Sequence, residues 1–181
     1  YDSRLWQGGD LEAVWPARFR DRFRPGEVLT IERGYRIGGA DFVEGLAFRI
    51  RKVTCDRGWM AVTGYDWMGE TGAWVARRSR SWSSGEALLQ QIARAICARA
   101  GVRLDISHGA AGQSYTPSFS AQAAENGLSA LFRLLRLNGA FLVNQEDGLH
   151  LQARSRWVDE GYGGGGHPVI EATRVRGTVS P

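Results

Sequence analysis

Metal binding and acid–base catalysis need residues of a few types at set spacings, and the histidines and cysteines are the first candidates. His108, His150 and His167 are scattered along the chain, and none belongs to a ligand-spaced motif such as H-E-x-x-H. Cys55 and Cys97 are also far apart and share no zinc or disulfide motif. We therefore predict no metal site, no cofactor, and two separate buried thiols in a reducing compartment.

The sequence also lacks the local motifs of nucleophilic catalysis and phosphate binding. It holds no G-x-S-x-G elbow and no Walker-type loop, and the glycine run 163–166 has no Lys-Ser/Thr after it. Asp66 stands out, because a carboxylate among Tyr65, Trp67 and Met68 could act as a perturbed acid. We favour the interpretation that Asp66 accepts backbone amides where a strand ends. No catalytic residue and no enzyme is predicted; a cell-wall hydrolase with paired carboxylates is a minor alternative.

An arginine- and tryptophan-rich stretch, residues 74–82, is the candidate binding segment. Trp74 and Trp82 flank Arg77, Arg78 and Arg80. Basic grooves with exposed aromatic rings bind single-stranded nucleic acid through phosphate contacts and base stacking. Arginine also packs on tryptophan within proteins, and a polar stretch is expected directly before a helix. The segment predicts either a nucleic-acid contact or a structural approach to a helix, and we favour the second.

The overall composition permits nucleic-acid binding without indicating it. The net charge is +4, from 23 basic and 19 acidic residues, and Lys52 is the only lysine. A hydrophobic content of 43% over 181 residues is sufficient for the packed core of a globular protein. No apolar run approaches the roughly 18 residues that a membrane-spanning helix needs, so we expect no membrane span.

The elements that position these residues change character along the chain. Residues 27–35, 45–55 and 58–68 read as three strands separated by glycine-containing turns, which predicts a small antiparallel barrel or sandwich. The Trp-rich stretch 1–19 before them shows no clear strand pattern. We therefore assign residues 1–75 to a barrel-like domain with an irregular N-terminal segment.

The second half predicts two helices and a hairpin. Apolar residues from Leu88 to Ala100 recur at helical period, with a capping box at Ser83 and Glu86 and a left-handed C-cap at Gly101. A second helix ends at Asn138-Gly139, and residues 141–152 form a hairpin with a turn at Asp147-Gly148. Residues 76–160 form this α+β subdomain, and 161–181 form a glycine-rich loop and a strand that returns towards the barrel. The fold class is α+β: a small antiparallel β-barrel followed by a subdomain of two helices and a hairpin.

The order of these pieces resembles the tail hub proteins of bacteriophages and related contractile injection machines, the family of late control protein D and the T-even baseplate hub. The resemblance covers roughly residues 24–152. It rests on Tyr65-Asp66 at the end of a strand, the helix motif from Ser83 to Val102, and the Asp147-Gly148-Leu149 hairpin. Between the last two lies a glutamine-then-glutamate opening of a leucine/arginine helix. Its residues are Gln122, Glu125, Leu131, Arg133, Leu134 and Gly139.

The resemblance implies a structural protein of a phage or gene-transfer-agent tail, serving host-cell attachment and genome ejection. Such hubs are homotrimers whose barrels form a pseudo-sixfold ring between the tail tube and the tip or spike. The implied partners are tail tube and distal tail proteins and tip, spike or fibre proteins. The implied location is the virion, at the tail tip or baseplate, after assembly in the bacterial cytoplasm. Arg77, Arg78 and Arg80 would then line a lumen through which DNA passes or meet a neighbouring subunit. A nucleic-acid-binding module is the alternative.

Overall fold

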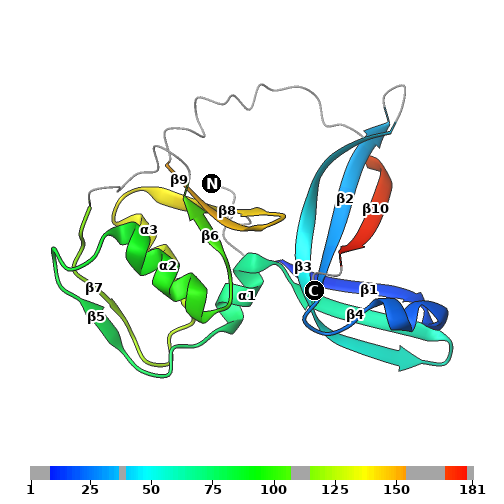
Figure 1. Ribbon diagram of the computed structural model, residues 1–181, viewed down its shortest axis with the longest axis horizontal. Helices are drawn as coiled ribbons and strands as arrows, with labels where there is room; N and C mark the ends of the chain where they lie inside the picture. The colour runs from blue at the N-terminus through cyan, green and yellow to red at the C-terminus, as the bar shows by residue number, and fades with distance from the viewer. Residues whose placement is uncertain (1–8, 37–39, 107–114, 154–169, 179–181) are drawn as a thin grey trace. The chain divides into compact units, whose positions relative to one another are not determined.

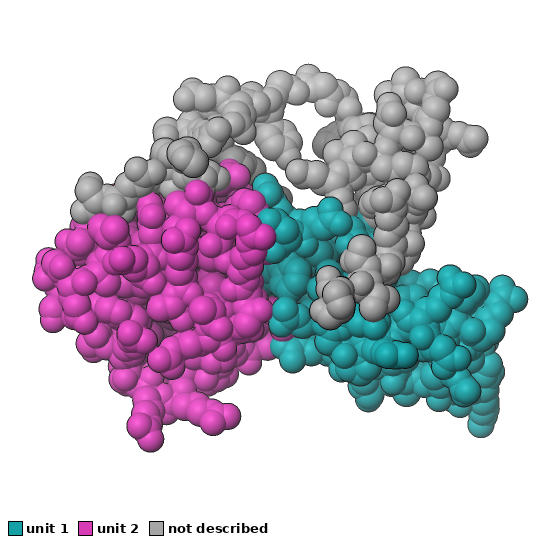
Figure 2. All heavy atoms as spheres, in the orientation of Figure 1, with its two compact units in different colours: residues 1–69, 145–147, 165–181 teal, residues 70–144, 148–164 magenta. Residues whose placement is uncertain are grey.

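The structure is a computed structural model that describes residues 9–36, 40–106, 115–153 and 170–178 (Figure 1). The chain divides into two compact units, coloured separately in Figure 2. The first unit comprises residues 1–69, 145–147 and 165–181, and the second comprises 70–144 and 148–164. The predicted glycine-rich loop, His108 and His167 lie outside the described residues.

The first unit is built on one antiparallel sheet that curls into a half-barrel. Its strands are β1 (Asp10–Pro16), β2 (Val28–Arg36), β3 (Ala40–Asp56), β4 (Trp59–Tyr65) and β10 (Ile170–Thr178). They lie in the order β1-β4-β3-β2-β10, so β10, from the far end of the sequence, pairs with β2. The α+β class is therefore confirmed, with β1 and β10 as the outer strands among the described residues.

The core of this sheet follows from the alternation of side chains along its strands. In β4, Met60 and Val62 are fully buried whereas Trp59 and Tyr65 are exposed, as a half-buried strand of period two requires. The buried cluster consists of Leu11, Leu29, Phe48, Ile50, Met60 and Val62. A short 3-10 helix, η2 (Ala17–Arg22), follows β1 and packs Phe19 against this cluster.

Two expectations for the first unit are wrong. Residues 10–16, in the stretch judged irregular, form β1 and pair in register with β4 from Asp10↔Tyr65 to Pro16↔Trp59. Cys55 is exposed rather than buried, because β3 places it near the solvent-facing turn that connects to β4. Cys97 is buried as predicted, and both thiols are free.

The second unit combines two helices with short strands. Helix α1 (Trp67–Ala73) contains the point at which the chain leaves the first unit. Strands β5 (Arg80–Trp82) and β7 (Phe119–Ala121) form a two-stranded ribbon, and β6 (Leu104–Ile106), β9 (Gly148–Ala153) and β8 (Ala140–Gln145) form a three-stranded sheet. Helices α2 (Leu89–Arg99) and α3 (Gly127–Arg136) lie side by side in Figure 1 and bury their apolar faces.

The helix ends show which capping predictions are correct. Helix α2 begins at Leu89 after the N-cap Leu88, so the predicted capping box at Ser83 and Glu86 is wrong. The Glu86 carboxylate does accept from the Ser83 backbone N–H at 2.7 Å, but it closes a separate turn before the helix. Gly101 has a φ of +70°, which confirms the left-handed residue predicted after the first helix. Gly139, where the second helix was predicted to end, has a φ of +62°, and α3 ends at Arg136 just before it.

No helix in the described ranges is long and apolar enough to cross a membrane.

Candidate functional site

The arginine–tryptophan segment, residues 74–82, is held by backbone hydrogen bonds along most of its length. At its start, Ala76 N–H donates to the Glu125 carbonyl at 2.9 Å, and Ala124 N–H donates to the Ala76 carbonyl at 2.8 Å. At its end, β5 pairs antiparallel with β7, with Arg80 opposite Ala121. The segment is therefore a fixed structural strip rather than a free basic arm.

The two tryptophans of this segment are used in packing. Trp82 is only 6% exposed and lies beside Phe119, with ring centroids 6.2 Å apart. The Arg80 guanidinium stacks on the Trp82 ring, 4.9 Å from its centroid. Trp74 is half-buried, and its ring lies against Gly127, where an added Cβ would approach it to 2.9 Å. A buried Trp82 cannot offer its faces to nucleic-acid bases.

Arg77 and Arg78 behave differently from Arg80. Both are exposed, and within the described residues neither side chain forms an ion pair or a hydrogen bond. The residues on either side of them are held: Ala76 by two backbone hydrogen bonds, and Ser79 because its Oγ accepts from Ala123 N–H at 2.9 Å. Between these two held residues the structure presents two unpaired guanidinium groups.

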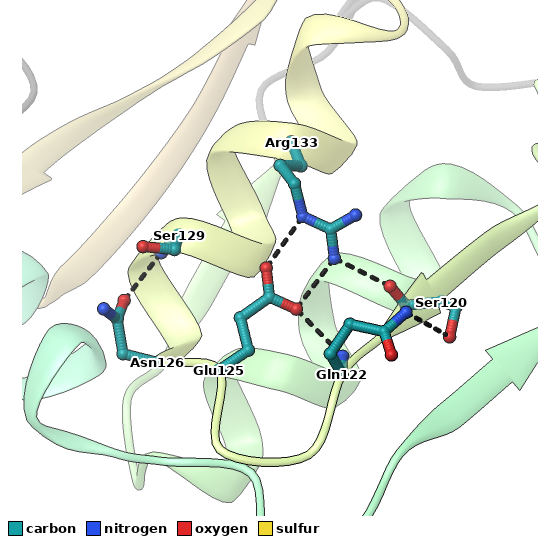
Figure 3. A network of polar contacts seen from close by, with 6 residues as sticks. All are labelled: Ser120, Gln122, Glu125, Asn126, Ser129 and Arg133. Carbon is teal, nitrogen blue, oxygen red and sulfur yellow. Dashed lines mark hydrogen bonds and ion pairs between the residues drawn. The ribbon is translucent and has the colours of Figure 1, made fainter.

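A polar clasp beside this segment ties β7 to α3 (Figure 3). The Arg133 guanidinium holds both oxygens of Glu125, with Nε–Oε1 and Nη2–Oε2 distances of 2.7 Å. Its Nη2 also donates to the Ser120 carbonyl at 2.7 Å, and the guanidinium lies 5.1 Å from the Phe119 ring centroid. Glu125 further accepts from the Gln122 backbone N–H at 2.9 Å. We call this group of residues the Arg133 clasp.

The electrostatics of the clasp follow from its geometry. The hydrogen bonds from Arg133 lower the pKa of Glu125 from its ordinary value, and the same bonds raise the pKa of Arg133. Both groups therefore stay charged at neutral pH, as a structural ion pair requires. A carboxylate whose oxygens are engaged by a guanidinium and a backbone amide is poorly placed to accept a proton from a substrate.

Asp66 has the structural role that we favoured from the sequence. Its side chain is buried, with Oδ1 accepting from Gly69 N–H and Oδ2 from Gly9 N–H, both at 2.6 Å. The first contact caps the start of α1, and the second holds the chain just before β1. Asp66 thus ties the end of β4 to two neighbouring backbone segments.

Sequence reasoning identified some of these residues and missed others. Glu125 and Arg133 were identified only through the family resemblance, and their contact was not predicted. The two residues are eight positions apart on either side of the start of α3, and no local sequence pattern indicates such a contact. Asn126, which caps α3 by accepting from Ser129 N–H at 2.8 Å, was detectable as an N-cap residue type.

Two solved structures that are similar to this chain are prophage tail proteins. A prophage tail protein of Listeria monocytogenes EGD-e matches 74% of this chain and 46% of its own, with 12% identity and a TM-score of 0.41. The 43 kDa tail protein of a Shewanella oneidensis prophage matches 82% of this chain and 47% of its own, with 17% identity and a TM-score of 0.41. The chain thus spans less than half the length of either protein. No family model and no curated protein matches.

Proposed function

We propose that this chain is a structural component of a phage-type tail that works by assembly. In this proposal it forms a homotrimeric hub ring at the tail tip or baseplate, joining the tail tube to the tip, spike or fibre proteins. The ordered sequence motifs that resemble tail hubs suggest this role. Arg77 and Arg78 then contact an acidic neighbour or line the lumen of the ring.

The observation that carries the proposal is that the conspicuous polar residues hold the fold together, apart from two exposed arginines. Asp66, Glu125 and Arg133 are engaged in contacts that hold the backbone together, whereas Arg77 and Arg78 lie exposed on a rigid strip. Arginine is enriched at protein–protein interfaces, so two exposed guanidinium groups beside such a scaffold suit contact with a neighbouring subunit. The same arrangement offers no nucleophile and base within reach of one another in this strip.

The alternative is a nucleic-acid-binding module, and Arg77 and Arg78 keep it open. Such a module would also stack bases on exposed aromatic rings, and Trp82 is not available for this because it is buried against Phe119. Binding through phosphate contacts alone would be steeply salt-dependent.

The test is the mass of the native assembly by light scattering at low and high ionic strength. We expect a trimer, three times 20.0 kDa or about 60 kDa, at both salts. The variant Arg77→Gln/Arg78→Gln reports whether the arginines contact a neighbouring copy. If they do, the variant trimer should dissociate at a higher protein concentration than the wild-type trimer. A monomer that binds duplex or single-stranded DNA, with affinity that falls steeply as salt rises, would replace the hub proposal by the nucleic-acid module.

A further inference from the structure

An exposed apolar spot lies on the outer face of the sheet of the first unit. Val14 and Trp59 are 60% and 58% exposed, the highest values among large apolar side chains in the described residues. They belong to neighbouring strands: Val14 pairs with Ala61, and Pro16 pairs with Trp59. Since residues two apart on a strand share a face, Val14, Pro16 and Trp59 form one continuous apolar surface.

Arginines lie next to one end of this surface in the chain. Arg18, Arg20 and Arg22 are exposed on η2, which directly follows Pro16 and is coloured blue in Figure 1. Arg57 is exposed in the turn before Trp59, and that turn is fixed to η2 because Ala17 N–H donates to the Gly58 carbonyl at 2.8 Å. We call the apolar surface and these four arginines the Trp59 patch.

The patch keeps a positive charge after its local carboxylates are counted. Asp21 and Asp56 contact Arg20 and Arg57 at 3.6 and 4.0 Å, and all four side chains are largely exposed to solvent. Glu12 is also exposed on the same face, two residues before Val14. Four arginines against these three carboxylates leave one positive charge, and pairs as exposed as these hold each other weakly.

Two of the arginines are also held in place before any partner arrives. The Arg18 and Arg22 guanidiniums both lie over the ring of Phe19, at 5.0 and 5.8 Å from its centroid. Phe19 itself packs on the core of the sheet. Guanidinium groups fixed on an aromatic ring lose less conformational entropy when they bind a carboxylate.

We propose that the Trp59 patch is a docking surface for a partner protein whose contact surface presents carboxylates around an apolar socket. Tryptophan and arginine are the residues that most often dominate such interfaces, with the apolar anchor at the centre. Phosphate backbones fit less well, because Val14 and Pro16 give them no contact and Asp21 and Asp56 repel them. A second copy of this chain fits less well too, because two positive patches would face each other. The surface lies in the first unit and does not depend on the hub proposal.

The probe is a short fluorescein-labelled peptide of alternating glutamate and leucine, titrated with the full chain and followed by fluorescence anisotropy. Trp59→Ser and the double variant Arg18→Gln/Arg57→Gln each remove one part of the patch. Arg94→Gln/Arg99→Gln is the matched control, since it removes the same charge from exposed positions of α2 in the second unit. Circular dichroism checks that every variant is folded.

We expect Trp59→Ser and Arg18→Gln/Arg57→Gln each to weaken peptide binding by about tenfold or more, with the control unchanged. Four results would overturn the proposal. They are an absence of peptide binding, equal weakening in the control, tighter binding of duplex DNA than of the peptide at the same salt, and a dimer in sedimentation that Trp59→Ser abolishes. The last would identify a second copy as the occupant.

Discussion

Breaking the Arg133 clasp should destabilise the second unit, and Arg133→Met is the sharpest way to do it. Methionine keeps the apolar stem but removes three hydrogen bonds of 2.7 Å, two to Glu125 and one to the Ser120 carbonyl. A hydrogen bond to a charged group contributes about 1.5–3 kcal/mol when buried, and an exposed ion pair less than about 1 kcal/mol. The Arg133 side chain is 48% exposed and that of Glu125 is 13% exposed, so the pair lies between these limits.

We therefore expect Arg133→Met to lower the free energy of unfolding by about 2 kcal/mol, of which roughly 1 kcal/mol is coupling to Glu125. Urea denaturation of the wild type, Arg133→Met, Glu125→Gln and the double variant measures both numbers. Arg136→Met is the control on the same helix, and its effect should stay within about 0.5 kcal/mol because Arg136 is exposed and unpaired among the described residues. A coupling energy near zero, or an equal loss in Arg136→Met, would refute the reasoning.

Three further outcomes follow from the structure. The pKa of Glu125 is lowered in the folded state. The stability that the Glu125 carboxylate contributes should therefore be complete above its ordinary pKa of 4.5 and disappear as the pH falls through the lower folded pKa. Acid titration followed by circular dichroism should show this loss in the wild type and not in Glu125→Gln. Burial raises the pKa of Cys97 to about 12, so maleimide should modify only Cys55 in the native protein, and mass spectrometry showing rapid double labelling would contradict the packing. In Gly127→Ala the new Cβ would lie 2.7 Å from the Thr71 carbonyl oxygen, so the free energy of unfolding measured in urea should fall by about 1–3 kcal/mol. In the control Gly72→Ala the atoms nearest to the new Cβ are 3.7 Å away, so the free energy of unfolding should stay the same or rise.

Elements with strong local patterns were predictable from the sequence. The alternation in β3 and β4 and the apolar stripe of α2 each continue long enough to identify a strand or a helix. The role of Asp66 was also predictable, because an aspartate directly after a strand commonly accepts backbone amides.

Elements whose pattern is broken by an exposed apolar residue or by long-range contacts were not predictable. Strand β1 places Val14 outward at 60% exposure, so its apolar residues do not alternate as a half-buried strand should. The sequence signal of the capping box at Ser83 is real, because Glu86 does reach back, but it closes a turn and α2 starts after Leu88. The burial of Trp82 depends on Phe119, which only the folded chain brings beside it.

We propose that this chain builds an assembly rather than binding nucleic acid or turning over a substrate. Electron-microscopic class averages of the purified chain test it most directly. We expect ring-shaped particles with threefold symmetry, unchanged by added DNA or by moderate salt. Particles the size of a single copy in every class, with no ring at any protein concentration tried, would contradict it.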